Sequence, residues 1–205
     1  KVVERGKGDG VYINTTGIGE CILEETGPWS VEPGDAIIIS GDLGRHGIAI
    51  MSTRAGIEFD APVESDSAAL WPAVSALIGA GLAIHCMRDL TRGGLSSALN
   101  EIAKARGVEL TIDEESIPVG EVVRGACEFL GLDPLYVANE GRFCVALPAR
   151  DAEKAVQVLK GVDVTAGAAV IGSVAEGRSR VVMRTRIGGR RVVDMLSGEQ
   201  LPRIC

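Results

Sequence analysis

Apolar residues recur every three or four positions in several stretches of the chain, and this spacing predicts amphipathic helices. The clearest stretch ends near Gly107, a residue type that often terminates helices. Its apolar face consists of Leu95, Ala98, Leu99, Ile102 and Ala103. The same spacing predicts helices at 72–78, 119–130 and 151–160, and a shorter helix is expected at 47–54. Cys127 lies on the apolar face of the helix at 119–130, so we expect it to be a small core residue.

Shorter apolar runs that are bounded by turn-forming residues predict β-strands. Single strands are expected at 36–40, 82–88, 108–112 and 168–174. Pairs of strands with a turn or kink between them are expected at 1–20, 135–148 and 180–196. Because strands and helices are mixed without a regular order, the pattern predicts an α+β fold in which helices cover one face of a mixed sheet.

The composition is that of a soluble globular protein, with 46% apolar and 24% charged residues. Aromatic residues make up only 3% of the chain, so Val, Ile, Leu and Ala are expected to build the core. The net charge of −7 argues against a nucleic-acid binder, which normally presents a basic surface. No apolar run approaches the roughly 20 residues that span a membrane, and the start does not resemble a signal peptide. We therefore expect a cytoplasmic protein.

The five cysteines include no CxxC pair, and their number is odd. Disulfide frameworks use an even number of cysteines, and zinc sites typically contain closely spaced pairs. The only histidines are His46 and His85, so a nitrogen-rich metal site is not expected either. The sequence therefore identifies no certain metal ligand.

Three loops carry residues that suit chemistry, and the first is RDLTRGG at 88–94, between a predicted strand and a predicted helix. Free backbone N–H groups at glycines and at a helix start suit phosphate. Arg88 and Arg92 add positive charge, and Asp89 suits Mg²⁺. The alternative is a plain glycine turn in which Asp89 or Thr91 bonds the local backbone.

The second loop, ANEG at 138–141, places Asn139 and Glu140 between two apolar runs. A buried, unpaired carboxylate is costly, so Glu140 is expected to face solvent, a cation or a functional site. The alternative is a turn with Asn139 in the left-handed conformation. The third loop, GDLGRHG, leads into a predicted helix and contains His46, which on its own is more often structural than catalytic.

The last nine residues, SGEQLPRIC at 197–205, show no periodicity and are expected to form a flexible tail. Nine extended residues reach about 30 Å, and Pro202 helps to keep the end extended. The terminal thiol of Cys205 suits a carrier that visits several sites, with Arg203 favouring the reactive thiolate. The alternative is an ordinary chain end.

Taken together and in this order, GDLGRHG, RDLTRGG, ANEG and the terminal PRIC resemble the HypE family of hydrogenase maturation factors. That family belongs to the PurM-like superfamily of aminoimidazole ribonucleotide synthetase and selenophosphate synthetase. The resemblance covers essentially the whole chain, and PRIC is its most specific part. It implies a PurM-like carboxy-terminal α+β domain at 31–196. The end of an amino-terminal ATP-binding and dimerisation domain is expected at 1–30, and the carrier tail at 197–205.

The resemblance also implies an activity. HypE proteins receive a carbamoyl group on the terminal cysteine from the carbamoyltransferase HypF and use ATP to dehydrate it to a thiocyanate. They donate the cyanide to iron held by the HypC–HypD complex, for a nickel–iron hydrogenase. By match to the family motifs, Cys205 is the expected carrier, and Glu140 and Lys1 are expected catalytic residues. Nucleotide contacts are expected from Arg88, Asp89, Thr91, Arg92, Gly93, Gly94, Asn139 and His46. The implied cofactors are ATP and Mg²⁺, and the implied assembly is a homodimer.

Most of the family's amino-terminal half, which supplies most ATP and Mg²⁺ ligands, is absent from this sequence. We therefore expect a fragment that does not turn over ATP alone. One alternative is another PurM-like kinase or synthetase acting on a small substrate, whose activity would survive Cys205→Ser. A second is a non-enzymatic metal chaperone that uses Cys205, but the sequence near the tail offers no companion ligand.

Overall fold

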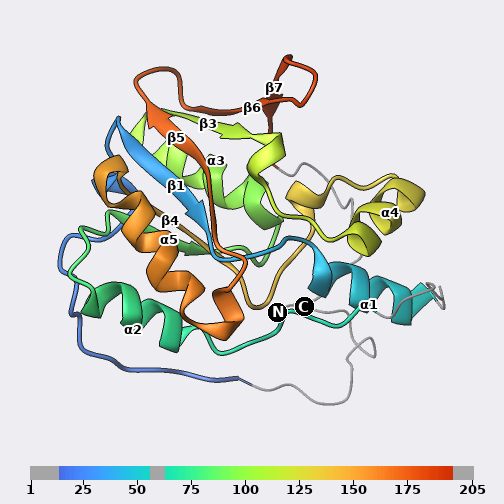
Figure 1. Ribbon diagram of the computed structural model, residues 1–205, viewed down its shortest axis with the longest axis horizontal. Coiled ribbons are helices and arrows are strands. Elements are labelled where there is room, and N and C mark those ends of the chain that lie inside the picture. Colours follow the sequence, from blue (N-terminus) through green and yellow to red (C-terminus); the bar gives the residue numbers. More distant parts are fainter. Residues whose placement is uncertain (1–13, 56–62, 196–205) are drawn as a thin grey trace, which may run out of the picture.

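The computed structural model describes residues 14–55 and 63–195, which form one mixed β-sheet with helices packed against it (Figure 1). The strands lie in the order β2-β4-β1-β5-β3-β6-β7. They are β1 (Asp35–Ile39), β2 (Cys86–Asp89), β3 (Glu109–Asp113), β4 (Phe143–Pro148), β5 (Ala169–Ala175), β6 (Arg180–Arg184) and β7 (Arg190–Val193). Strands β3 and β6 are parallel, and the other neighbouring pairs are antiparallel. The predicted mixed sheet and α+β class are confirmed.

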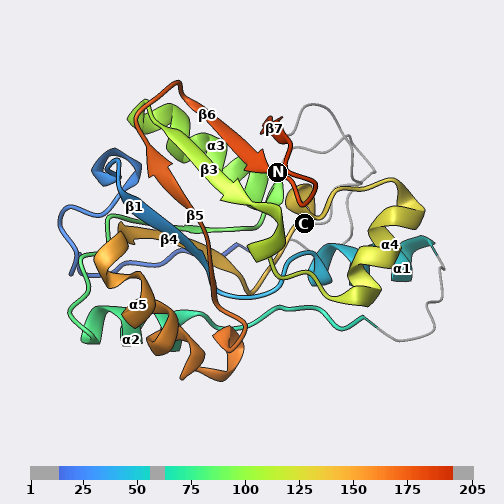
Figure 2. The same ribbon diagram turned by 45° about the horizontal axis from the view of Figure 1, so that its top comes forward.

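Helices lie on both faces of the sheet, so the expectation that they cover one face is wrong. They are α1 (Arg45–Ala55), α2 (Trp71–Gly79), α3 (Gly94–Arg106), α4 (Glu121–Leu130) and α5 (Ala152–Lys160). Figures 1 and 2 show α3 on one side of the sheet and α2 and α5 on the other. The central strand β1 explains why. Its residues Ile37 and Ile39 belong to the apolar cluster that contains the buried face of α3, and Ala36 and Ile38 belong to the cluster of α2 and α5.

Helices α1 and α4 pack against each other at one end of the sheet and form a third, smaller core (Figure 1). Its buried residues include Ile48 of α1, Val123 and Cys127 of α4, and Val137. The helix predicted from apolar spacing at 119–130 therefore exists, and the prediction that Cys127 is a buried core residue is confirmed.

The first half of the stretch at 135–148 is not a strand, contrary to the sequence-based prediction. Pro134–Tyr136 forms one turn of 3-10 helix, and regular strand begins only at Phe143. Pro134 fixes a helical φ at the start of this turn, and the Asp133 carboxylate accepts a hydrogen bond from the Leu135 N–H at 3.0 Å. The run is apolar because it is buried in the fold, but Pro134 and the Asp133 cap make its first part a turn instead of a strand.

Two other predicted strands differ in extent. Strand β2 begins at Cys86, so residues 82–85, which were expected to begin it, are not assigned as strand, although the His85 N–H still donates to the Ala146 carbonyl of β4 at 3.0 Å. Of the strand pair expected at 1–20, residues 14–20 are exposed and form no strand, and the remainder lies outside the described residues. The hairpin expected around Gly188 is confirmed as β6 and β7, which are antiparallel.

The order of the strands decides which loops meet. Strands β1 and β2 flank β4, and both run antiparallel to it. Because of this, the carboxyl ends of β1 and β2 lie at the same sheet edge as the start of β4. Ile39 is opposite Cys144, and Asp89 is opposite Phe143. The loops at 41–47, 88–94 and 138–141 must therefore converge there.

A search of the described residues for a helix that is both long and apolar enough to cross a membrane finds none. The sheet extends from Asp35 to Val193. The sequence-based limits of the domains, at 30 and 196, remain predictions.

A candidate active site where three loops meet

The Asn139 side chain joins all three loops that the sequence singled out. It is fully buried. Its Oδ1 accepts a hydrogen bond from the Gly44 N–H at 2.7 Å, in the loop at 41–47. Its Nδ2 donates to the carbonyl oxygens of Leu90, in the loop at 88–94, and Val137, at 3.1 and 3.0 Å. One asparagine thus ties the loop that carries Glu140 to the other two.

These contacts bear on the earlier expectations for Asn139. None of the described non-glycine residues has a positive φ, so Asn139 is not in the left-handed conformation. Its amide is occupied by protein backbone, which suits a residue that positions the loops. Direct contact between Asn139 and a nucleotide stays a prediction.

Replacement of Asn139 by alanine is expected to destabilise the fold. The change leaves the buried Gly44 N–H and the Val137 carbonyl without their side-chain partner, at a cost of about 1–3 kcal/mol for each such group. The Leu90 carbonyl keeps the Asn139 backbone N–H as a donor. Urea unfolding measures this difference. Asn14→Ala, at an exposed position, is the control and should change the free energy of unfolding by less than about 0.5 kcal/mol. Equal stability of the two variants would show that Asn139 does not hold the loops.

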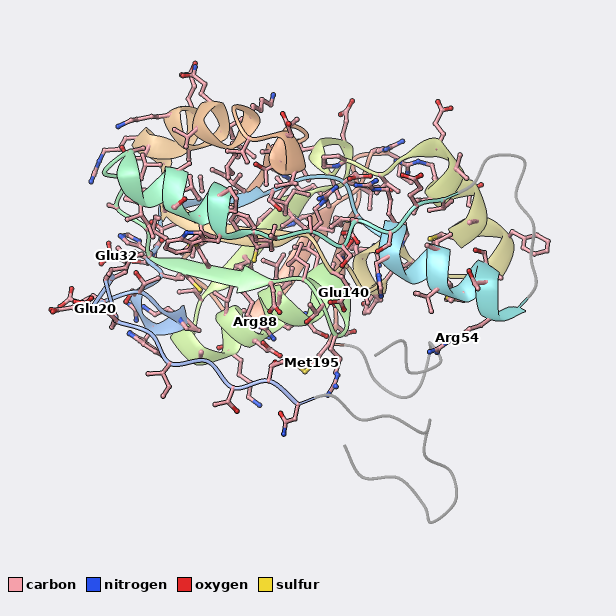
Figure 3. All side chains as sticks on the ribbon, turned by 90° about the horizontal axis from the view of Figure 1, so that it is seen from below. Glu20, Glu32, Arg54, Arg88, Glu140 and Met195 are labelled. Carbon is pink, nitrogen blue, oxygen red and sulfur yellow. The ribbon has the colours of Figure 1, made fainter. Side chains whose placement is uncertain are left out.

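Glu140 follows directly on this anchored residue and is only half-buried (Figure 3). Its backbone N–H donates to Asp66 Oδ1 at 3.2 Å. Within the described part of the chain, the Glu140 carboxylate has no hydrogen bond and no ion pair. The prediction that this side chain faces solvent or a site agrees with this placement. A carboxylate on a fixed backbone and without protein partners is available to act on a bound group.

The loop at 88–94 is built differently from a simple phosphate cradle. Gly93 and Gly94 both have positive φ and are both buried. A Cβ at Gly94 would lie 2.6 Å from the carbonyl oxygens of Leu135 and Val137, so this glycine permits close approach of two backbone segments. Nucleotide contacts by Gly93 and Gly94 stay predictions.

The polar residues of this loop largely contact one another. Arg88 lies at the end of β2, where its guanidinium pairs with Asp89 and its Nε donates to Glu101 Oε2 at 3.1 Å. The Thr91 hydroxyl donates to Asp89 Oδ2 at 3.2 Å. Arg92 is exposed. The structure thus brings the loop's charged side chains to the same sheet edge as Glu140, and their predicted contacts with nucleotide are not tested.

His46 is the second residue of α1, at the end of the third loop, and is half-buried. Its Nδ1 lies 2.9 Å from the Ser65 hydroxyl. The next residue, Gly47, donates its N–H to the Ala138 carbonyl at 3.1 Å, and a Cβ there would lie 2.3 Å from Val137. The absence of a side chain at Gly47 therefore lets α1 approach the loop of Glu140. The nucleotide-binding role expected for His46 stays a prediction.

Sequence reasoning missed a buried arginine next to the Glu140 loop. Arg142 is 5% exposed, and its guanidinium makes four hydrogen bonds. Two go to the Asp42 carboxylate and carbonyl, at 2.6 and 3.0 Å. The others go to the carbonyls of Gly141 and Val164, at 2.8 and 3.1 Å. The signal in the sequence was a charged residue directly before the apolar strand FCVAL, a position where a solvated side chain is not expected.

Two of the predicted catalytic residues, Lys1 and Cys205, lie outside the described residues. The segment at the end of β7, directly before the tail, is hydrogen-bonded to α3. The buried Ser96 hydroxyl donates to the Asp194 carbonyl at 2.6 Å, and Asn100 Nδ2 donates to the Val193 carbonyl at 2.9 Å. These anchors lie in the first two turns of α3, the helix that follows the loop at 88–94.

Three of the other cysteines are unsuited to nucleophilic chemistry. Burial raises the pKa of the Cys86 and Cys127 thiols to about 11 and that of Cys144 to about 12. These thiols therefore remain protonated at neutral pH. Cys21 is an exposed free thiol. Its exposure makes it the natural comparison for any modification of Cys205.

Among the described residues, no group of three or more His, Cys, Asp or Glu side chains could hold a metal ion. Asp89, which on its residue type could hold Mg²⁺, contacts Arg88 and Thr91 instead of a second carboxylate. The described part of the chain therefore does not fit a Mg²⁺ site of its own.

Comparison with known proteins places this geometry in a family. The profile of the family "AIR synthase related protein, C-terminal domain" matches residues 32–184. Carbamoyl dehydratase HypE of Azotobacter vinelandii is 51% identical over 208 residues, which cover 100% of this chain and 61% of that protein. The chain thus spans about three fifths of the length of this relative.

Solved structures agree with this match. A crystal structure of hydrogenase maturation protein HypE has a TM-score of 0.87 and 47% identity, covering 91% of this chain and 61% of that one. A structure of HypE in complex with ATP has a TM-score of 0.84 and 46% identity, covering 88% of this chain and 55% of that one. A structure of a HypE–HypF complex has a TM-score of 0.80 and 41% identity, covering 83% of this chain and 56% of that one. With both fold and sequence in agreement, the chain belongs to the AIR synthase related protein family, as a carboxy-terminal portion similar to HypE hydrogenase maturation proteins.

Proposed function

We propose that this chain is the carboxy-terminal part of an ATP-dependent carbamoyl dehydratase of hydrogenase maturation. The observation that carries the proposal is the Glu140 carboxylate, which has no partner among the described residues and sits on a backbone held by Asn139 and Asp66. The relatives named carbamoyl dehydratase HypE support the reaction class. The solved HypE structures with ATP and with HypF support ATP as the co-substrate and a HypF-type carbamoyltransferase as the source of the group.

The proposed reaction removes one water from an S-carbamoyl group on Cys205. The carbonyl oxygen of the carbamoyl group attacks the γ-phosphorus of ATP, ADP leaves, and one N–H proton is lost, which gives an O-phosphorylated imidate. The remaining N–H proton is then removed while the C–O bond breaks, inorganic phosphate leaves, and a thiocyanate forms. Glu140 is the proposed base for the second proton. Lys1 is the proposed group that stabilises negative charge on the departing phosphate.

The geometry also suits delivery of the tail. The segment before the tail is anchored to α3 through Ser96 and Asn100, and α3 begins directly after the loop that Asn139 ties to Glu140. From that point, the ten residues 196–205 can reach about 33 Å when extended. That reach allows Cys205 to visit both Glu140 and an outside transferase.

Mg²⁺ and most ATP ligands are assigned, in this proposal, to the amino-terminal part that relatives have and that this chain does not cover. A homodimer and transfer of cyanide to a HypC–HypD complex complete the proposal, on the basis of the motif resemblance. We also propose that the chain alone does not hydrolyse ATP. Measurable ATPase activity of the isolated 205-residue chain would contradict that part.

Replacement of Cys205 by serine is expected to abolish transfer of a radiolabelled carbamoyl group by a HypF-type transferase. The thiolate is the nucleophile, and a serine hydroxyl does not ionise at neutral pH. The three buried thiols cannot substitute, because with pKa values of about 11 or 12 fewer than roughly one in a thousand is ionised at pH 7.5.

Cys21→Ser is the matched control, because Cys21 is an exposed free thiol in the described chain. Its label uptake should equal that of the unaltered protein. Uptake that survives in Cys205→Ser and disappears in Cys21→Ser would show that the tail is not the carrier.

A further inference from the structure

A polar segment that follows residue 62 crosses directly over the loop of Glu140. At the crossing, Asp66 Oδ1 accepts the Glu140 backbone N–H at 3.2 Å. A Cβ on Gly141 would lie 1.8 Å from the Asp66 carbonyl oxygen, so the two backbones are in direct contact and residue 141 must be glycine. The Glu140 peptide unit is therefore bonded directly to Asp66, and it follows Asn139, whose side chain is bonded to two other loops.

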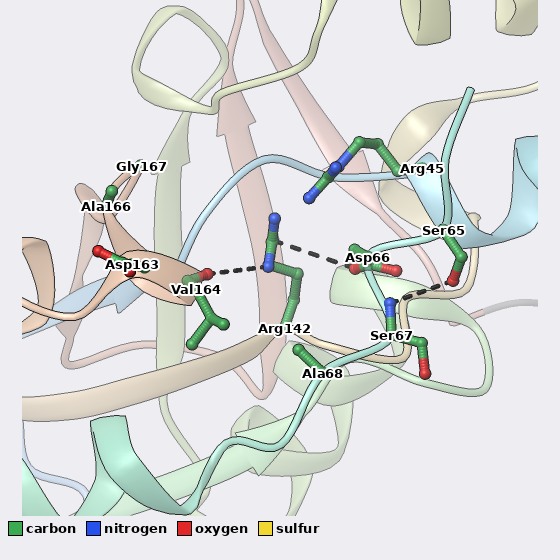
Figure 4. A pocket seen from close by; sticks show the side chains of 10 residues that line it. All are labelled: Arg45, Ser65, Asp66, Ser67, Ala68, Arg142, Asp163, Val164, Ala166 and Gly167. Atoms are coloured by element: carbon green, nitrogen blue, oxygen red, sulfur yellow. Dashed lines mark hydrogen bonds and ion pairs between the residues drawn. The ribbon is translucent and has the colours of Figure 1, made fainter. Parts of the chain in front are cut away.

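The Asp66 carboxylate is in an unfavourable position. Its side chain is fully buried, and Oδ2 has no hydrogen-bond partner among the described residues. The nearest cation is the Arg142 guanidinium, with Nε at 4.0 Å from Oδ2, and Figure 4 shows the two side chains facing each other. Arg142 makes its short contact with Asp42 instead, at 2.6 Å. A buried carboxylate with one hydrogen bond and a distant cation costs stability.

An apolar residue would fill this position at a lower cost, so stability of the fold does not account for Asp66. What the position gains is an acceptor for the N–H of the residue that carries the candidate base. We propose that Asp66 is a positioning residue for Glu140. It fixes the Glu140 peptide unit so that the carboxylate projects at a constant angle toward the carbamoyl group. This inference rests on the proposed dehydratase function and adds to it a residue that does not touch the substrate.

The surroundings of Asp66 supply a matched control. Asp66 and Asp163 line the same pocket, which has a volume of about 230 Å³, and Figure 4 shows Asp163 on the opposite wall. Asp163 is exposed, and its backbone carbonyl accepts from Ala166 N–H. The two aspartates therefore share a pocket and a charge, but only Asp66 contacts the Glu140 loop.

The test uses a protein that carries this chain together with the amino-terminal part found in its relatives. Single-turnover dehydration of carbamoylated Cys205 is measured over a range of ATP concentrations. Asp66→Ala is expected to lower the limiting rate constant by about 10- to 100-fold, since a small misplacement of a reacting group has such an effect. The ATP concentration for half-maximal rate should not change, because Asp66 does not contact nucleotide in the proposal.

Asp66→Asn separates positioning from a general structural role. Asparagine Oδ1 accepts the same hydrogen bond without a charge, so this variant should retain at least about a third of the rate. Asp163→Asn should match the unaltered protein. The inference is overturned if Asp66→Ala dehydrates at the unaltered rate, or if Asp66→Asn loses as much as Asp66→Ala. Should Asp66→Ala fail to fold, the rate of Asp66→Asn is the test: a rate well below about a third of the unaltered rate would overturn the inference. Failure of the unaltered protein to dehydrate would instead count against the proposed function.

Discussion

Glu140→Gln is expected to reduce ATP-dependent dehydration of the carbamoylated tail by about 10²- to 10⁴-fold, the range that a positioned general base contributes. The amide is nearly isosteric with the carboxylate but cannot accept the N–H proton. The Glu140 side chain makes no hydrogen bond with the described residues, and its backbone N–H to Asp66 is retained in the variant. Fold, ATP affinity and carbamoylation of the tail should therefore be preserved. Rapid-quench measurement of thiocyanate formation in single turnovers tests this expectation.

Glu32→Gln is the control for this variant. Glu32 is exposed, and Figure 3 shows it far from Glu140 across the molecule. Loss of one surface carboxylate should leave the dehydration rate unchanged. If Glu140→Gln and Glu32→Gln dehydrate equally fast, the proton is taken by another group, and Glu140 is not the base.

Arg142→Met is expected to lower the free energy of unfolding by about 3–5 kcal/mol, the usual cost of removing one partner from a buried ion pair. The change removes the Arg142 cation from Asp66, and among the described residues it leaves Asp42 paired with Arg45 alone, at 3.0 Å. It also leaves the Gly141 and Val164 carbonyls without the Arg142 donor. Methionine matches only the aliphatic part of arginine, so the loss reflects the missing guanidinium with its charge and hydrogen bonds. Equilibrium unfolding in urea measures it.

Arg150→Met provides the comparison. The Arg150 side chain is 78% exposed, and its Nε lies 3.9 Å from Asp151 Oδ2. Exposed pairs of this kind contribute little, so the expected change is below about 1 kcal/mol. An Arg142→Met protein that is no less stable than Arg150→Met would mean that the Arg142 network does not hold the loops together.

The helices could be predicted from the sequence because their burial follows a local rule. In α3, α4 and α5 the apolar spacing identifies the buried face directly, and Leu99, Val123 and Leu159 are all in the core. Gly107 ends α3 in the left-handed conformation, as its position after the apolar stripe indicated. These helices can be predicted because the pattern depends only on residues that are close together in the chain.

The strands were harder to predict because burial alone does not distinguish them from buried turns. The apolar run LYVA is buried or half-buried, but Pro134 and Asp133 impose a turn of 3-10 helix on it. The run of three isoleucines in β1 is a strand buried on both faces, which requires helices on both sides of the sheet. Continuous apolar character in β1 was the signal for two covered faces.

The motifs of the candidate site could be found in the sequence, but their arrangement could not. GDLGRHG, RDLTRGG and ANEG are separated by tens of residues, and only the order of β2, β4 and β1 brings them to one edge. Asp66 lies in a polar segment without periodicity, so its contact with the Glu140 N–H depends on how the chain crosses the loop. The bonds of Asn139 to two distant loops likewise follow from tertiary structure.

The most direct test of the account is the mass of the carboxy-terminal peptide. A protein that carries this chain and the amino-terminal part of its relatives is carbamoylated by a HypF-type transferase, purified, and incubated with or without ATP. The peptide ending in Cys205 is expected to carry one carbamoyl group and to lose the mass of one water only when ATP is present. An unmodified Cys205 in the presence of a demonstrably active transferase would show that the tail is not the carrier and would favour a PurM-like kinase acting on a small substrate.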